Sequence, residues 1–335
     1  MRSATYVLPI RRTDVAVDAE TTQYLATIAR RCELIVVDGS CSQSFGAADE
    51  SWSSFAVHVA PRSDIQGLNG KVRGVLTGIA LATHERIVIA DDDVRYDAPA
   101  LERTIATLDH ADVVRPQNYF APVVWHAHWD TARTLLNRVL GGADFPGTLA
   151  VRRSTMIRVG GYNADVLFEN LELIRTVKAG GGTVASPLDL YVRRIPPTTR
   201  HFWSQRRRQA YDELARPWRF LTSLAVVPVV VALLARRKYA GVALGGAMTV
   251  VAAELGRRRA GGHTIFSPVG SAFAPLWILE RSLCSWFALT SWLRGGCPYA
   301  GGRLRVAATP NRALRKRLRD RAVPDRTEEE ARERT

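Results

Sequence analysis

Three consecutive carboxylates, Asp91, Asp92 and Asp93, follow an apolar run over Ile87–Ala90. A run of this length is typical of a buried parallel strand, and ligands gather beyond the carboxyl ends of such strands. Because alternate residues of an extended segment point the same way, Asp91 and Asp93 can share a face while Asp92 turns aside. Two hard oxygen ligands beside a crevice suit Mg²⁺ or Mn²⁺ carrying a diphosphate. The same residues are also typical of an acidic turn that closes a strand, and this stretch alone leaves both interpretations open.

Strands and helices alternate on both sides of this acidic stretch. Apolar runs predict further strands over Tyr6–Ile10, Glu33–Val37, Phe55–Val59, Ala111–Pro116, Gly147–Arg152, Thr183–Ser186 and Leu188–Val192. Helical spacing predicts helices over Gln23–Arg31, Val72–Thr83, Ala98–Leu108, Trp125–Leu140 and Phe168–Ala179. This alternation indicates βαβ units, an α/β fold and a mostly parallel sheet. Pro196 and Pro197 then mark a boundary.

The charge of the chain favours an anionic partner. The 335 residues carry a net charge of +14 with a pI of about 10.3, and arginine supplies almost all of the basic excess. Such an excess is compatible with nucleic acid or with an anionic membrane surface. The arginine clusters flank the apolar segments that follow Trp218, and no zinc-finger, RRM or KH pattern accompanies them. We therefore expect a membrane and no nucleic acid, with a membrane-surface nucleic-acid binder as an alternative.

The cysteines and the amino terminus indicate the compartment. Cys32, Cys41, Cys284 and Cys297 form no CxxC pair and no regular framework, so we interpret them as free thiols in a reducing compartment. The first residues, MRSATYVLPI, lead directly into a strand-like run and lack the apolar core of a signal peptide. The first domain is therefore expected to remain in the cytoplasm.

The second half of the chain predicts membrane attachment. His201–Trp218 interleaves aromatic residues with arginines, as in an amphipathic helix of the membrane interface, although an ordinary charged surface helix is an alternative. Three apolar runs follow, over Phe220–Ala235, Tyr239–Ala253 and Ile265–Leu293. The first would extend roughly 24 Å as a helix, which is short for a bilayer span.

The number of spans stays open. Arg236, Arg237 and Lys238 separate the first two apolar runs, and two complete crossings would place them outside, against the positive-inside tendency. Re-entrant or in-plane helices would remove this conflict. A Gly-rich turn and a short strand are predicted over Gly295–Ala307, and a basic helix near anionic lipid over Asn311–Arg321.

The order of several motifs resembles a known family. Asp38 after its strand, GLNGKV over Gly67–Val72, the DDD cluster, GGYNADVLFEN, QRRR and then apolar helices succeed one another. This order resembles a membrane-anchored family 2 glycosyltransferase with the GT-A nucleotide-diphospho-sugar fold. The GLNxKV segment resembles the ceramide and hopanoid glucosyltransferase branch. The likeness covers roughly residues 5–219, and the motif order is far more specific than a lone DxD.

The resemblance implies a division of the chain. Residues 1–200 would form the GT-A catalytic domain, with a mostly parallel sheet and flanking helices. Residues 201–219 would form the interface helix and residues 220–293 the membrane-associated helices. A cytoplasmic strand and basic tail would occupy residues 294–335.

It also implies roles in donor binding. Asp38 matches the acidic residue that holds uracil, although it could merely cap the next turn. Lys71 matches the basic residue near the diphosphate, with Arg73 assisting; the alternative is that both are solvated helix-start residues. Asp91 would face ribose and metal, and Asp93 would ligate Mg²⁺ or Mn²⁺ directly.

The family's catalytic base lies in a Glu-Asp pair at a helix start, typically on the Asp, and that pair here reads Glu169-Asn170. Asn cannot act as a general base, so Glu169 is the best substitute. Glu172 on the same helical face is second and Asp165 third. Glu169 could also simply cap its helix, and the two roles are compatible.

The QRRRQ run matches the family's QxxRW motif in part. Gln205 and Arg208 are retained, and Gln209 replaces the Trp that helps processive synthases seat a polymer end. This replacement argues against a polymerase. Arg208 is expected to close over the diphosphate, and a charged interface helix is the alternative.

Together these motifs predict an inverting, metal-dependent glycosyltransferase. The resemblance implies that it moves a sugar from a UDP-sugar to a lipid or lipid-linked acceptor at the cytoplasmic face of the inner membrane. A nucleotide-sugar-binding pseudo-enzyme is an alternative because Asn170 has replaced the base. A retaining transferase or a nucleotidyltransferase on the same fold is another, since neither needs that base.

Overall fold

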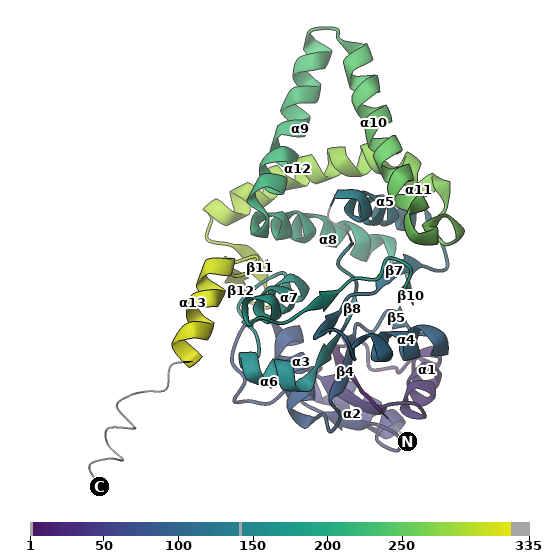
Figure 1. The fold of residues 1–335 in the computed structure, drawn as a ribbon, viewed down its shortest axis with the longest axis vertical. Coiled ribbons are helices and arrows are strands. Elements are labelled where there is room, and N and C mark those ends of the chain that lie inside the picture. The colour runs from purple at the N-terminus through teal and green to yellow at the C-terminus, as the bar shows by residue number, and fades with distance from the viewer. Residues whose placement is uncertain (1–2, 141–142, 323–335) are drawn as a thin grey trace, which may run out of the picture.

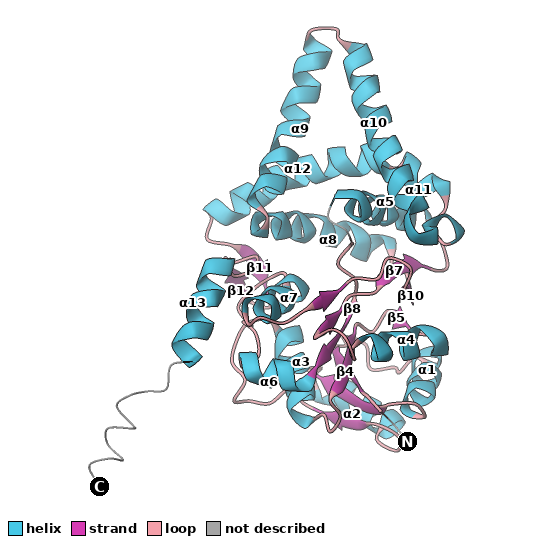
Figure 2. Ribbon diagram, viewed as in Figure 1, coloured by secondary structure: helices cyan, strands magenta, loops and turns pink. Residues whose placement is uncertain are grey.

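A mostly parallel sheet forms the centre of the N-terminal half (Figures 1 and 2). The computed structural model describes residues 3–140 and 143–322. The strand order is β3-β2-β1-β4-β8-β6-β9, and β8 runs antiparallel to its neighbours β4 and β6. The strands are β1 (Thr5–Ile10), β2 (Glu33–Asp38), β3 (Val57–Val59), β4 (Arg86–Ala90), β6 (Val113–Val114), β8 (Thr148–Arg152) and β9 (Val184–Ala185). The predicted α/β class with a mostly parallel sheet is confirmed.

Helices cover both faces of the sheet because each central strand is apolar on both sides. In β1, Tyr6 and Leu8 enter one core while Val7 enters the other, as the alternation of strand side chains requires. One face is covered by α1 (Ala19–Ala29), α2 (Ser42–Trp52) and α4 (Ala98–Thr107). The opposite face is covered by α3 (Gly70–Leu81), α6 (Arg153–Val159) and α7 (Glu169–Ala179).

A second, small sheet lies beyond the carboxyl edge of the first. It has the order β5-β10-β7 and consists of β5 (Val94–Arg95), β10 (Tyr191–Arg194) and β7 (Gln117–Phe120). Because β5 follows the acidic stretch directly and pairs with β10, the end of β10 is brought beside Asp93. The next helix, α5 (Trp125–Leu140), leads from this sheet into the layer of C-terminal helices.

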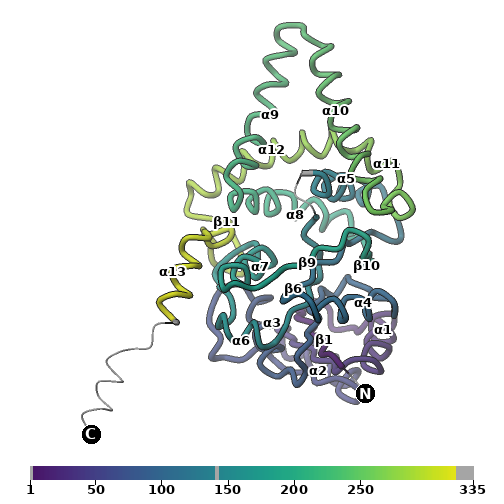
Figure 3. Tube along the Cα trace, viewed as in Figure 1, coloured from purple at the N-terminus to yellow at the C-terminus, as the bar shows by residue number. Residues whose placement is uncertain are grey.

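The C-terminal half is helical, and two of its helices project as an antiparallel hairpin (Figures 1 and 3). Its elements are α8 (Thr199–Tyr211), a 3₁₀ turn (Asp212–Ala215), α9 (Pro217–Ala235), α10 (Tyr239–Arg258), a 3₁₀ segment (Arg259–Thr264), α11 (Pro268–Ala272) and α12 (Ala274–Leu293). The long helix α12 crosses the base of the hairpin and packs against α5, α8 and α9. Two segments, Pro217–Ala235 and Tyr239–Thr264, are long and apolar enough to cross a membrane.

After α12 the chain returns to the N-terminal half. The hairpin of β11 (Cys297–Tyr299) and β12 (Gly302–Leu304) leads to α13 (Asn311–Ala322), which packs against α7. The predicted basic helix is therefore present, but it lies against the first domain (Figure 1). The part of the predicted tail over residues 323–335 lies outside the described residues.

Two helices that flank the sheet were not predicted. In α2 the segment SQSFGAADESW has no regular apolar stripe, and tertiary burial of Ala48 and Trp52 supplies what its pattern lacks. The short helix α6 follows the predicted strand without a break, so its residues carried no separate start signal. The predicted interface helix also differs in its burial, because α8 has Phe202 and Arg206 inside the protein.

Helix α3 packs closely on the sheet at Gly78, where an added Cβ would lie 2.3 Å from a methyl carbon of Val7. We expect Gly78→Ala to lower stability by about 1–3 kcal/mol through overpacking. Gly46→Ala in α2 is the matched control, because nothing lies within 4 Å of its added Cβ. The thermal unfolding midpoint should fall for the first variant and stay or rise for the second. Equal midpoints would contradict this packing.

Candidate active site

A charged cleft of about 360 Å³ lies between the carboxyl edge of the central sheet and the C-terminal helices. Its lining includes six of the residues singled out in the sequence: Lys71, Asp91, Asp93, Glu169, Gln205 and Arg208. They come from α3, from the end of β4, from the start of α7 and from α8. Segments far apart in the sequence are thus brought to one site by the crossovers of the α/β fold.

Lys71 joins two of these elements. Asn69 caps α3, and its side chain accepts hydrogen bonds from the backbone N–H groups of Lys71 and Val72. The Lys71 Nζ atom lies 2.6 Å from Asp91 Oδ1 and 2.8 Å from Glu169 Oε1. Burial opposes the charge, but the two carboxylates outweigh this effect and raise the pKa of Lys71. The ammonium therefore stays charged and holds the sheet edge to α7.

The two outer carboxylates of the DDD cluster share one arginine. Arg194, at the end of β10, donates from Nε to Asp93 Oδ2 at 2.8 Å, and its Nη2 lies 3.6 Å from Asp91 Oδ2. Gly147 makes this arrangement possible, since an added Cβ would lie 2.8 Å from Asp91 Oδ2. Asp92 is exposed while Asp91 and Asp93 share Arg194, as predicted, but the stretch is a turn, in which the N–H of Val94 donates to the carbonyl of Asp91 at 3.1 Å, and not an extended segment.

The residues present fit a divalent cation that arrives with a diphosphate. Asp93 retains a buried oxygen, Oδ1, without a hydrogen-bond partner. Within the described residues, no three His, Cys, Asp or Glu side chains are grouped to hold an ion. One or two carboxylates plus substrate phosphates and water are the usual ligands of Mg²⁺. Asp93, with Asp91 beside it, could therefore hold the ion when the phosphates complete its coordination.

Two residues predicted to help bind the donor, Asp38 and Arg73, lie outside this cleft. Asp38 is buried at the end of β2 and is held by His58 Nε2 at 3.3 Å and by the N–H of Ser40 at 2.8 Å. Burial opposes its charge, but these hydrogen bonds lower its pKa, so it is an ionised acceptor. Arg73 donates to the carbonyl of Ile65 instead of facing the cleft.

The alternative carboxylates near Glu169 have structural partners. Glu172 is fully buried and accepts a hydrogen bond of 2.6 Å from the N–H of Thr309. Asp165 accepts one from the N–H of Leu68 in the loop that precedes α3. The structure therefore brings Glu169 to the cleft and does not bring Glu172 or Asp165 there.

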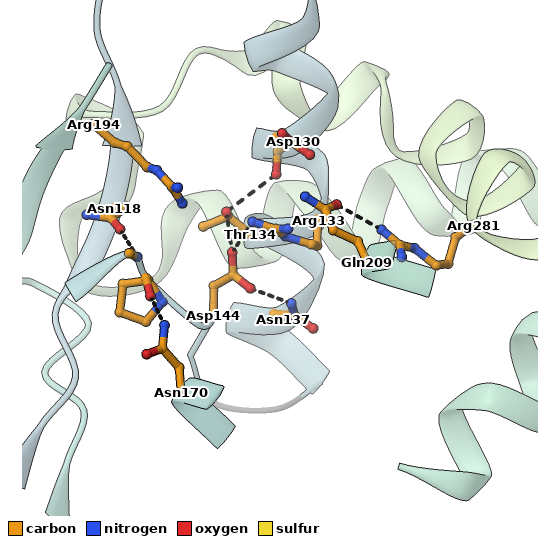
Figure 4. A network of polar contacts seen from close by, with 12 residues as sticks. Asn118, Asp130, Arg133, Thr134, Asn137, Asp144, Asn170, Arg194, Gln209 and Arg281 are labelled. Atoms are coloured by element: carbon orange, nitrogen blue, oxygen red, sulfur yellow. Dashed lines mark hydrogen bonds and ion pairs between the residues drawn. The ribbon is translucent and has the colours of Figure 1, made fainter. Parts of the chain in front are cut away.

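Asn170, at the position of the expected base, is also part of the cleft. Its side-chain amide donates to the carbonyl of Pro146 at 2.8 Å (Figure 4). Beyond it, Asp144 accepts hydrogen bonds from Thr134 and Asn137, both at 2.7 Å, and lies 3.3 Å from Arg133 (Figure 4). These contacts tie the cleft floor to α5.

Several cleft residues were missed in the sequence: Arg133, Asp144, Arg194, Asp212, Arg216 and Arg281. Arg194 carried a usable signal, because it follows a predicted strand just as the DDD cluster does. Arg133 and Arg281 lie within helices, and Asp144, Asp212 and Arg216 lie in or beside the short connections between elements, where no periodic pattern singles them out. Asp212 has a second unusual property: burial raises its pKa to about 7, although Arg208 opposes the shift.

The fold is that of a nucleotide-sugar transferase of the GT-A type. The chain is similar to a mannosyltransferase from Pyrobaculum calidifontis solved with GDP-Man and Mn²⁺, with a TM-score of 0.50 and 16% identity over 85% of this chain and 87% of that one. At this identity the similarity shows the fold, and the predicted GT-A class is confirmed.

Other solved structures are similar over a smaller part of the chain. The glucosyl-3-phosphoglycerate synthase of Mycobacterium tuberculosis, solved with Mn²⁺, UDP and phosphoglyceric acid, gives a TM-score of 0.43 and 15% identity over 62% of this chain and 76% of that one. TarS of S. aureus gives 0.41 and 13% over 62% and 64%. No protein-family model and no curated protein matches the sequence.

The raised pKa of Asp212 predicts a pH effect on stability. The unfolded chain releases this proton near pH 3.9, the ordinary value for aspartate, whereas the folded chain holds it to about 7. The folded state binds more protons in that window, so its stability falls as the pH rises through it. Asp212→Asn removes this loss. Its thermal midpoint, relative to the natural chain, should be higher at pH 8 than at pH 5.

The control for this prediction is Asp92→Asn, which removes a carboxylate from an exposed position of the same cleft. We expect its midpoint to follow that of the natural chain at both pH values. An Asp212→Asn variant that also follows the natural chain would show that Asp212 titrates at its ordinary value.

Proposed function

We propose that the protein is an inverting, metal-dependent glycosyltransferase that moves a sugar from a UDP-sugar to a lipid or lipid-linked acceptor at the cytoplasmic face of the inner membrane. The observation that carries the proposal is the meeting of Asp91, Asp93, Lys71 and Glu169 in one cleft of a GT-A fold. This cleft offers both cations for a leaving diphosphate and a carboxylate for an acceptor.

The chain's own residues can stabilise the leaving group. When bound beside Asp93, Mg²⁺ or Mn²⁺ would supply Lewis-acid chemistry at the diphosphate. Lys71 and Arg208 add positive charge around Glu169, from which they lie 2.8 Å and 4.0 Å away respectively. Arg194 can exchange its carboxylate contacts for phosphate oxygens, which a guanidinium binds with the same fork geometry. Asp38, which the resemblance assigned to the donor base, has a fully buried side chain held by His58 outside the cleft, so we propose no contact between it and the base.

Glu169 is the proposed base for a hydroxyl acceptor. Burial opposes its charge, but Lys71 and Arg208 lower its pKa, so it is ionised and able to accept a proton. Its position at the start of α7 also favours a carboxylate through the helix dipole. Asn170 beside it has no proton-accepting side chain and holds the carbonyl of Pro146 instead.

The helical hairpin supports a lipid acceptor. Helix α9 has 19 residues and would extend roughly 28 Å, close to the ~30 Å of a bilayer core. Its apolar side chains and those of α10 are largely exposed, Met248 at 65% and Val231 at 58% among them. Large exposed apolar surface of this kind is typical of a membrane contact. The cleft lies at the base of this hairpin, where it would meet an acceptor confined to the bilayer.

The metal role predicts the effect of removing Asp93. We expect Asp93→Ala to lower UDP-sugar turnover in the presence of Mn²⁺ by about 100-fold or more, because Lewis-acid stabilisation supplies several kcal/mol. Membranes that contain the variant are incubated with radiolabelled UDP-sugars, and the lipid extract is counted. Asp92→Asn, with the neighbouring carboxylate removed, should keep most of the activity. Unchanged turnover in Asp93→Ala would refute the metal assignment.

The base role predicts a different defect for Glu169→Gln. We expect transfer to fall by about 10²–10⁴-fold while the UDP-sugar still binds, because the amide cannot accept the proton. Calorimetry measures donor binding, and the anomeric configuration of the product distinguishes inversion from retention. If the natural chain binds UDP-sugar but transfers nothing to any lipid fraction, it is a binding pseudo-enzyme. Full activity in Glu169→Gln would assign the base elsewhere.

A further inference from the structure

Arg281 is a buried arginine in the middle of α12 with unused guanidinium donors; the charge of Asp212 is near enough to act on it, but the two form no ion pair. Its side chain borders the cleft, and the residue is only 3% exposed. Among the described residues it forms no ion pair, and its one side-chain hydrogen bond runs from Nη2 to Gln209 Oε1 at 3.3 Å (Figure 4). Its Nε and Nη1 atoms are buried without a partner. Its guanidinium carbon lies 5.2 Å from the centre of the Trp277 ring, a contact that offsets only part of the desolvation of a buried charge.

A second buried arginine of the same layer, Arg138, has a structural role and can be compared with Arg281. Arg138 of α5 is fully buried, and it also forms no ion pair with the described residues. Its guanidinium, however, donates to the carbonyls of Gly256 and Leu188 and to the hydroxyl of Tyr191, at 2.9–3.1 Å. The chain thus satisfies Arg138 fully, and Arg281 differs in having donors left over.

Arg206 of α8 faces the same part of the cleft. Its Nη2 pairs with Asp130 at 2.9 Å, and Nη1 has only Glu280 at 3.8 Å and no hydrogen bond. Burial lowers the pKa of Arg206, and the nearby charge of Arg281 adds to the effect, against the opposing carboxylates. Two guanidinium groups with unused N–H donors therefore lie close together at the membrane side of the cleft.

We propose that Arg281, with Arg206, binds a phosphate group of the acceptor, which makes the acceptor a phosphate-bearing lipid. This inference rests on the proposed function and adds the chemical class of the acceptor. Phosphate oxygens are the usual partners of paired guanidinium groups, and they would supply the acceptors that these donors lack.

The surroundings of α12 favour a lipid over free phosphate. The same helix also carries Ile278 and Leu279, which line an apolar groove of about 550 Å³ shared with α9 and α10. One helix therefore presents a guanidinium to the polar cleft and aliphatic side chains to the membrane hairpin. A phosphate bound at Arg281 lies at this boundary, where a lipid keeps its headgroup.

The test uses the full chain in nonionic detergent and two probes, dodecyl phosphate and inorganic phosphate. Dodecyl phosphate should raise the thermal unfolding midpoint of the natural chain. In Arg281→Gln the concentration that gives half of this shift should rise by about tenfold or more. Arg294→Gln is the matched control: it removes an exposed arginine at the end of the same helix and should respond like the natural chain.

The thermal midpoints of the variants without any probe provide a second measurement, which distinguishes Arg281 from an arginine with a purely structural role. Arg281→Gln should keep or raise the midpoint without any probe, because it removes an unpaired buried charge, whereas Arg138→Gln should lower it. Arg281→Lys should respond to dodecyl phosphate more weakly than the natural chain and more strongly than Arg281→Gln.

Three outcomes would overturn the inference. An undiminished response of Arg281→Gln to dodecyl phosphate would refute the site. So would the absence of any response in the natural chain. An equal response to inorganic phosphate would refute the lipid source. Calorimetry of UDP-sugar with Mn²⁺ separates this test from the proposed function: Arg281→Gln should bind the donor normally, and a natural chain that does not bind it would refute the function and leave the phosphate site standing.

Discussion

The ammonium of Lys71 is the contact on which the site depends. It lies within 2.8 Å of carboxylates from two elements, Asp91 after β4 and Glu169 at the start of α7. Without a cation between them, two buried carboxylates would repel each other, and one would take up a proton. Asn69 caps α3 and fixes the first turn of that helix. This turn sets the position of Lys71 between the two carboxylates. One side chain thus connects the acidic stretch to the start of α7.

The C-terminal segment completes this arrangement from the far end of the chain. Tyr299 of β11 donates to Asn69, and its ring lies 5.2 Å from the guanidinium carbon of Arg208. The N–H of Thr309 donates a hydrogen bond to the carboxylate of Glu172. Glu169 is therefore the carboxylate of α7 that faces the cleft. The helices between α8 and β11 are thus held at both ends by the catalytic half. This attachment keeps the hairpin in a defined position above the cleft.

The sequence predicted the parts of the site that follow strands or begin helices. Asp91, Asp93, Lys71 and Glu169 stand at such boundaries, where periodicity ends and a polar residue needs another reason to be present. It could not predict Arg133 or Arg281, because each lies in mid-helix and its neighbours decide which way it faces. It missed α2 for the same reason, since that helix depends on the burial of Trp52 more than on its own pattern. For Asp38 the sequence motif located the residue, but it could not show that His58 lies beside it, because this contact depends on the fold.

The distribution of satisfied and unsatisfied charges separates the two walls of the cleft. On the sheet side, carboxylates and cations neutralise one another: Lys71 with Glu169, and Arg194 with Asp93. On the side of the C-terminal helices, Arg281 has buried donors that nothing in the described chain accepts from. A protein that keeps such a charge gives up stability that an apolar residue would retain. The phosphate binding proposed for Arg281 would account for its retention.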